Sequence, residues 1–161
     1  MTLPEITFAN VVDYIGTLAF AISGIRLAST KNFDWFGAYV VGLATAIGGG
    51  TVRDLMLDVP VFWMRNGIYF LITLLALLLV VLFGKVVVRQ KYTWFIFDTI
   101  GLGMFAVIGI EKTLGVGFPF WVAIVMGSVT GAGGGVIRDV FLNEVPLLFR
   151  AEIYAVACVL G

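Results

Sequence analysis

Two aspartates, Asp13 and Asp98, each stand as the one charged residue in a long apolar stretch. A carboxylate among apolar groups is costly to bury, so it marks a site for an ion, a proton or a cationic partner. The chain supplies cations for this role, because an Arg-Asp pair follows each of two runs of three glycines. We predict that Asp13 pairs with Arg53 and Asp98 with Arg138, and that the two pairs flank a pore as gates or charge filters. The alternative is that both pairs only fix the packing of helices.

The glycine runs are the second candidate feature. They lie at Gly48–Gly50 and Gly133–Gly135. Glycine is about 1 kcal/mol less favourable than alanine inside a helix, and backbone groups freed within a membrane need protein or water as partners. The runs therefore predict a break or kink in two helices, near a permeation path. The alternative is close helix packing, because Gly42 and Gly127 extend each run into a row of small residues spaced by four.

Two threonines, Thr45 and Thr130, precede the glycine runs by three residues. Their hydroxyls either line a hydrated path or hydrogen-bond to the preceding helical turn. The candidate pore or gate residues are, in full, Asp13, Thr45, Gly48, Gly49, Gly50, Arg53, Asp54, Asp98, Thr130, Gly133, Gly134, Gly135, Arg138 and Asp139.

The composition places these residues in a lipid bilayer. Of 161 residues, 61% are apolar and 12% are charged, and the mean hydropathy is +1.08, whereas a soluble domain is about 25% charged. The net charge is zero, one cysteine is present and there is no histidine. We therefore expect no nucleic-acid partner, no internal disulfide, no cofactor, no metal beyond transient monovalent cations, and no enzymatic activity.

Five apolar stretches are long enough to span a bilayer, which takes about 20 residues. They are Ile6–Ile25, Trp35–Val52, Asn66–Gly84, Tyr92–Ile110 and Thr113–Ile137, and a sixth stretch begins near Ile153. The sixth stops at Gly161, too soon to cross, so we expect the natural protein to continue. The expected fold is an all-α polytopic membrane protein with one transmembrane domain over residues 1–161.

The chain also repeats itself. A shift of 85 residues aligns Asp13–Leu57 with Asp98–Leu142 without a gap, and 18 of the 45 pairs are identical. Each unit holds three spans, repeat 1 over about residues 6–84 and repeat 2 over about residues 92–161. Because three is odd, the second unit enters the membrane from the opposite side. This arrangement predicts inverted repeats, which are typical of transport proteins.

The orientation follows from the basic residues of the short loops, which favour the cytoplasmic side. With the N-terminus outside, the inner loops carry six basic residues and the outer loops only two, Arg65 and Lys112. We predict a multi-pass protein of a prokaryotic inner or plasma membrane with its N-terminus outside. Glu111 and Lys112 are interpreted as topology signals.

The two motifs Gly48-Gly49-Gly50-Thr51-Val52-Arg53-Asp54 and Gly133-Gly134-Gly135-Val136-Ile137-Arg138-Asp139, with the three-span repeat, resemble the prokaryotic branch of the trimeric intracellular cation (TRIC) channels. This branch is also labelled glycine-transporter-like. The resemblance covers Asp13–Gly161. It implies seven helices, with helices 1–3 and 4–6 as inverted repeats, helices 2 and 5 kinked at the glycine motifs, and a seventh helix that this sequence does not contain.

The same resemblance implies a function. It implies a homotrimer in which each protomer holds a hydrophilic pore for monovalent cations, chiefly potassium, bordered by helices 1, 2, 4 and 5. The alternative is a secondary transporter of a small amino acid such as glycine, which needs alternating access. A third hypothesis is a scaffold whose glycine faces only pack helices. High flux, saturable uptake, or neither would distinguish the three.

Overall fold

The computed structural model describes residues 8–83 and 93–150, which form helices joined by short turns. Four long helices each contain a segment that is long and apolar enough to cross a membrane: α1 (Phe8–Thr30), α2 (Trp35–Met56), α6 (Thr93–Gly115) and α7 (Phe120–Phe141). The shorter helices are α3 (Phe62–Arg65), α4 (Ile68–Leu82) and α8 (Leu147–Arg150). The expected all-α membrane fold is confirmed.

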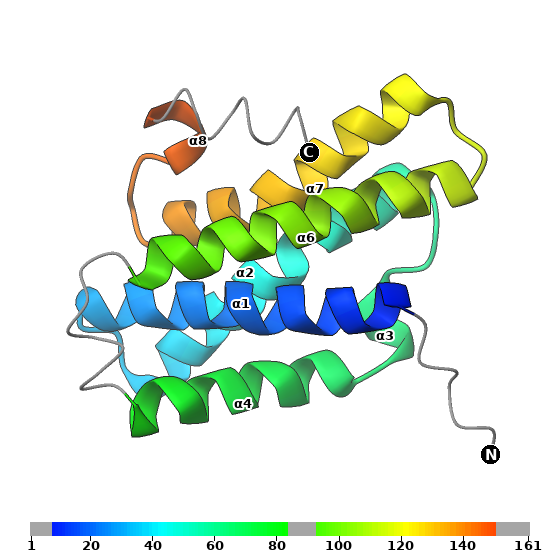
Figure 1. Cartoon of the computed structure of the whole chain (residues 1–161). Helices are drawn as coiled ribbons and strands as arrows, with labels where there is room; N and C mark the ends of the chain where they lie inside the picture. Colours follow the sequence, from blue (N-terminus) through cyan, green and yellow to red (C-terminus); the bar gives the residue numbers. More distant parts are fainter. Residues whose placement is uncertain (1–7, 84–92, 151–161) are drawn as a thin grey trace, which may run out of the picture.

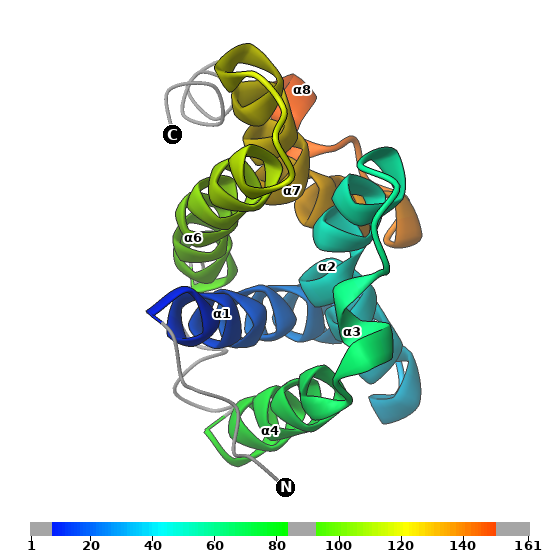
Figure 2. The same ribbon diagram turned by 90° about the vertical axis from the view of Figure 1, so that its right-hand side faces the viewer.

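The four long helices pack as a ring, in which α1 contacts α2, α2 contacts α7, α7 contacts α6 and α6 contacts α1. Helix α4 packs outside the ring against α1 and α2. Figure 1 shows α1 and α6 side by side and antiparallel, with α4 on the far side of α1, and Figure 2 shows the same order from the end of the bundle. The antiparallel course of α1 and α6 supports the inverted repeat.

The two halves also match in detail. Helices α1 and α6 both have 23 residues, and α2 and α7 both have 22. After α2 the chain turns at Asp58 with a φ of 53°, and after α7 it turns at the aligned residue Asn143 with a φ of 54°. Asp and Asn are the non-glycine residues that tolerate this left-handed conformation best. The same local chemistry therefore ends both helices.

The helices continue past the charged residues at which the expected spans stop. Helix α1 runs beyond Ile25 through Arg26 to its last turn, and Arg26 is buried. The expected fifth span is wrong at its start, because Thr113 still belongs to α6 and α7 begins only after Pro119, its N-cap residue. A charged residue ends a span only where it would face lipid, and Arg26 is buried in protein.

The remaining span limits differ less. The expected third span starts at Asn66, but α4 begins at Ile68, and the chain first forms the single turn of α3. The expected sixth span near Ile153 lies outside the described residues.

The glycine runs do not interrupt their helices, since α2 and α7 are helical throughout Gly48–Gly50 and Gly133–Gly135. The sequence predicted a break or a kink at each run, and the break is therefore absent from both helices. The glycines instead allow the backbones of α2 and α7 to touch. A Cβ atom on Gly49 would lie 2.1 Å from the carbonyl oxygen of Thr130, and one on Gly134 would lie 2.2 Å from that of Thr45. A row of small residues permits this approach of two membrane helices.

A second pair of glycine contacts joins the helices within each half. A Cβ on Gly24 of α1 would lie 2.9 Å from the Cα of Gly42 on α2, and a Cβ on Gly109 of α6 would lie 2.8 Å from the Cα of Gly127 on α7. Glycines thus bring the backbones together in three neighbouring pairs of the ring, α1–α2, α2–α7 and α6–α7, as the close-packing interpretation predicts.

We predict that Gly49→Ala and Gly134→Ala destabilise the protein, because the added methyl group would overlap a backbone carbonyl of the crossing helix. Overpacking of this kind costs about 1 to 3 kcal/mol. The measurement is the thermal unfolding midpoint of the purified protein in detergent. Gly103→Ala is the matched control, since a Cβ there meets nothing within 4 Å and alanine improves helix propensity. Equal midpoints for Gly49→Ala and Gly103→Ala would contradict the close crossing.

Candidate functional site

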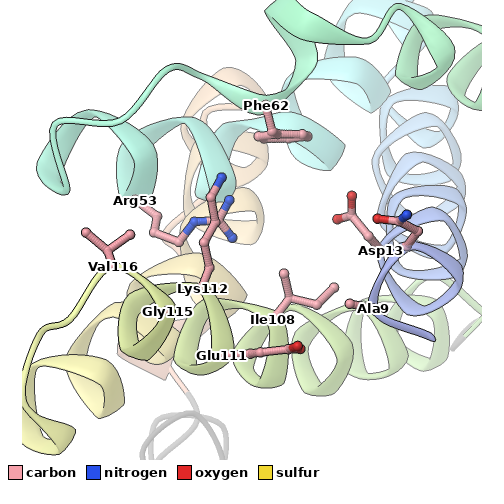
Figure 3. Close-up of a pocket in the computed structure, with 10 residues that line it drawn as sticks. Ala9, Asp13, Arg53, Phe62, Ile108, Glu111, Lys112, Gly115 and Val116 are labelled. Atoms are coloured by element: carbon pink, nitrogen blue, oxygen red, sulfur yellow. The ribbon is translucent and has the colours of Figure 1, made fainter. Parts of the chain in front are cut away.

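A cavity of about 540 Å³ opens at one end of the ring, between the start of α1, the ends of α2 and α6, and α3 (Figure 3). Its lining residues are Ala9, Asn10, Asp13, Arg53, Phe62, Ile108, Glu111, Lys112, Gly115 and Val116. Four of these ten are charged. In Figure 3 the Asp13 carboxylate faces the cavity from one wall, and Arg53 and Lys112 lie at the opposite wall. We call this part of the bundle the Asp13 end.

The Arg-Asp pair of α2 ties the end of that helix to the following turn. Arg53 Nε donates to Asp54 Oδ1 over 2.8 Å, and Asp54 is fully buried. The second carboxylate oxygen, Oδ2, accepts the backbone N–H of Phe62 at 3.0 Å. Asp54 therefore neutralises the arginine and satisfies an N–H group at the start of α3 that has no partner within that helix.

A third helix joins the same carboxylate through Lys112 of α6. Its Nζ lies 2.8 Å from Asp54 Oδ1 and 2.9 Å from Oδ2. The ring of Phe62 lies beside both cations, with its centroid 5.9 Å from Arg53 Cζ and 5.9 Å from Lys112 Nζ. Distances of this size are typical of cation–π contacts. Lys112, interpreted from sequence as a topology signal, is thus a structural part of the cavity.

Asp13 has a different partner from the predicted one. The hydroxyl of Tyr69, on α4, donates to Asp13 Oδ2, and among the residues that the structure describes no salt bridge joins Asp13 to Arg53. That predicted pair is therefore wrong. The reason is that Tyr69 binds Asp13 and that Arg53 lies at the opposite wall of the cavity (Figure 3). The ring of Tyr69 is fixed by Phe62, 4.6 Å away and edge-on.

At the other end of the bundle, which we call the Asp98 end, the predicted pair is present. Arg138 Nη1 donates to Asp98 and also to the Ser23 hydroxyl at 2.8 Å. The guanidinium lies 5.3 Å from the centroid of Trp94. Arg138, Asp98 and Ser23 are all 0% exposed, so α1, α6 and α7 are packed against one another at this level.

The rest of the Asp98 end copies the Asp13 end. Arg138 Nε donates to Asp139 Oδ1 at 2.8 Å, and Asp139 Oδ2 accepts the backbone N–H of Leu147 at 3.0 Å. An ion pair between Lys31 and Glu144 adds a contact between the turn after α1 and the turn after α7. Each repeat therefore builds the same Arg-Asp-backbone unit, but only the Asp98 end closes around it.

The remaining candidates lie in the bundle interior. Thr45 and Thr130 are fully buried and donate to the carbonyl oxygens of Val41, at 2.6 Å, and Met126, at 2.5 Å. The structure thus shows the second of their two alternatives, bonding to the preceding turn. Gly49 and Gly134 lie at the crossing of α2 and α7 described above. None of these residues lines the cavity.

Sequence reasoning missed the partners of the charged residues. Ser23, Phe62 and Tyr69 carry no charge, so hydropathy does not single them out. One signal was present, since Tyr69 recurs as Tyr154 under the 85-residue shift. A second signal lies in the positions where the repeats differ. Ser23, which binds Arg138, aligns with Ile108, which lines the cavity together with Arg53.

We predict that Asp98→Asn destabilises the protein more than Asp13→Asn. Removing one member of a buried ion pair costs about 3 to 5 kcal/mol. The amide oxygen introduced by Asp13→Asn would still accept the Tyr69 hydroxyl, so that change costs about 1 kcal/mol. Chemical or thermal unfolding of both variants in the same detergent measures the difference. Equal losses would contradict the asymmetry between the two ends.

The fold and this site define a class: a polytopic membrane protein with charged groups buried at both ends of an antiparallel helix ring. The chain belongs to the family described as Glycine transporter, which it matches over residues 10–85 and 95–161. The UPF0126 inner membrane protein YadS of Escherichia coli K12 is 41% identical over 156 residues, covering 93% of this chain and 73% of that protein. YvgT of Bacillus subtilis is 41% identical over 155 residues, covering 94% and 76%.

Solved structures of prokaryotic TRIC channels have the same fold. The TRIC orthologue from Rhodobacter sphaeroides superposes with a TM-score of 0.89 at 36% identity, covering 95% of this chain and 79% of that chain. A prokaryotic TRIC channel in 0.5 M KCl gives 0.88 at 32% identity, covering 94% and 79%. The predicted family is confirmed. These structures are channels rather than enzymes, in agreement with the expected absence of enzymatic activity, and the relatives place the chain in a prokaryotic plasma membrane.

Proposed function

We propose that this chain is a potassium-permeable monovalent cation channel, with one hydrophilic pore inside each protomer of a homotrimer. The observation that carries the proposal is the charged cavity that enters the four-helix ring from the Asp13 end. The superposed structures support it, because they are described as TRIC cation channels and one as a trimeric channel orthologue. The face of α4 that is rich in exposed leucines is available for lipid or for a neighbouring protomer.

The charges around the cavity favour cations. Three carboxylates, Asp13, Asp54 and Glu111, lie at or beside the cavity with two cations, Arg53 and Lys112. The formal balance is one net negative charge. A low-dielectric wall strengthens the field of such a charge and raises the local concentration of cations. Asp13 is the proposed cation-attracting residue, because its carboxylate faces the cavity (Figure 3).

The Asp98 end is the proposed gate. Arg138 closes the ring there through Asp98, Asp139 and Ser23, so a continuous path requires the guanidinium to move. Such a move requires water to reach both Arg138 and Asp98, because a buried charge left without its partner costs about 3 to 5 kcal/mol. The other residues of the proposed site position this gate and the cavity, namely Thr45, Gly48, Gly49, Gly50, Thr130, Gly133, Gly134 and Gly135.

The second candidate is a secondary transporter of a small amino acid. One observation favours it: opposite charges face each other across the cavity, which suits a zwitterion (Figure 3). The family description, Glycine transporter, points the same way. In this mechanism the carboxylate of the substrate binds Arg53 and Lys112 and its ammonium group binds Asp13.

We predict discrete, cation-selective potassium currents from the protein in planar bilayers, and a higher open probability for Ser23→Ala. This change removes one hydrogen bond of about 1 kcal/mol from Arg138 in the closed state, which shifts a two-state equilibrium about fivefold. Single-channel recording in potassium against sodium and chloride gradients measures both. Ser29→Ala is the control on the same helix, since its hydroxyl donates to the carbonyl of Ile25.

Silence in the bilayer, together with saturable uptake of labelled glycine into liposomes, would overturn the channel and establish the transporter. In that case Asp13→Asn should raise the half-saturating glycine concentration, because the ammonium group loses its counter-charge. An unaltered open probability in Ser23→Ala, with normal currents, would contradict the gate alone.

A further inference from the structure

The Lys112 ammonium group lies between a buried carboxylate and an aromatic ring at the wall of the cavity. It contacts both oxygens of one carboxylate, Asp54, at 2.8 and 2.9 Å. Asp54 is fully buried, and the lysine side chain is still 31% exposed. The Phe62 ring lies beside it, with the ring centroid 5.9 Å away. A compact cation is thus held by two carboxylate oxygens and an aromatic face at the wall of the cavity.

We propose that this position is a binding site for a monovalent metal cation, and that Lys112 is a tethered cation that competes for it. When the lysine side chain swings into the cavity, a potassium ion takes its place on Asp54 Oδ1 and Oδ2, beside Phe62. Lys112 then acts as a built-in inhibitor of permeation. The inference rests on the proposed cation channel and adds to it a site and a competitor.

The second repeat supports this interpretation, because among the described residues it builds the same unit without a lysine. Asp139 binds Arg138 and the backbone N–H of Leu147, as Asp54 binds Arg53 and the N–H of Phe62. The residue aligned with Lys112 is Leu27, which lines a cavity of about 100 Å³ together with Asp139. The carboxylate therefore needs no lysine to fulfil its structural role. Lys112 is an addition to the unit at the Asp13 end, where the cavity of about 540 Å³ lies.

The lysine ammonium group and a potassium ion match in size and charge. An ammonium group is a compact point charge on a flexible stem, and its radius is close to that of a potassium ion. Carboxylate oxygens and an aromatic face suit either cation. A single carboxylate that keeps Arg53 as a neighbour binds a cation weakly, and weak binding is what permeation requires.

Displacing the lysine also leaves no buried charge unpaired. Asp54 keeps Arg53 and the Phe62 N–H. The partly exposed lysine side chain lines the cavity, so its ammonium group can move toward Asp13 and Glu111, which line the same cavity. Replacing the Lys112 ammonium group with a potassium ion therefore requires only the lysine side chain to move, without a change in the backbone.

The test uses Lys112→Met in the full-length protein, because methionine keeps helix propensity and length but removes the charge. We expect the potassium conductance at low salt to rise about threefold, the effect of removing one unit charge about 6 Å from a permeating cation in water. Lys112→Arg keeps the charge and should leave the conductance near the wild-type value. Leu27→Met is the control at the aligned position of the other repeat, and Lys31→Met is the control for loss of an exposed lysine.

A second measurement does not depend on conduction. Crystals of Lys112→Met soaked in rubidium or thallium salts should show an anomalous peak at the Asp54 carboxylate, and Lys112→Met with Asp54→Asn should lose it. An unchanged or lower conductance in Lys112→Met, or no peak at Asp54, would overturn the site while wild-type currents still support the channel. A peak at Asp54 in a protein that carries no current would keep the cation site and overturn the proposed channel function.

Discussion

The crossing of α2 and α7 is the contact on which the rest of the structure depends. At Gly49 and Gly134 no Cβ atom separates the two backbones, so α2 and α7 cross closely there, while Arg53 and Arg138 lie at opposite ends of the bundle. In a bilayer, packing of this kind must supply much of the association energy, because lipid tails remove the hydrophobic drive between helices. The glycines thus set where each arginine lies, although they touch neither.

Burying these arginines is costly, and the chain offsets the cost locally. Each arginine is followed by an aspartate, so the ion pair forms within one helix and does not depend on a neighbouring helix. The other oxygen of the aspartate accepts the first N–H of the next short helix. Because the pair is neutral and bonded to the following turn, each helix can continue past its charges to the end of the bundle. This local pairing also explains why the expected second and fifth spans stop four residues before the ends of α2 and α7.

Most of the fold was predictable from sequence, because hydropathy and the 85-residue shift depend on many residues. The start of α7 was not, since the apolar run from Thr113 continues through a turn that only Pro119 marks. Of the two predicted ion pairs, Asp98–Arg138 was correct and Asp13–Arg53 was wrong. The repeat predicted the positions of both aspartates, but the partner of each aspartate depends on uncharged residues. Ser23, which binds Arg138, differs from its aligned residue in the other repeat, and Tyr69, which binds Asp13, lies on another helix, α4.

The asymmetry of the ends bears on the choice between channel and transporter. Alternating access needs two gates that close in turn, and inverted repeats supply them when both repeats can adopt both arrangements. Here the Asp13 end would have to move Tyr69 from Asp13 before an Asp13–Arg53 pair could form, whereas Arg53 could keep Asp54 as Arg138 keeps Asp139. Its Ile108 could not replace Ser23 as an acceptor for the arginine. If the Asp13 end closed in the same way as the Asp98 end, its arginine would therefore lack the hydrogen bond that Arg138 makes with Ser23. A single gate below an open cavity requires no such closure, and this physical difference favours the channel.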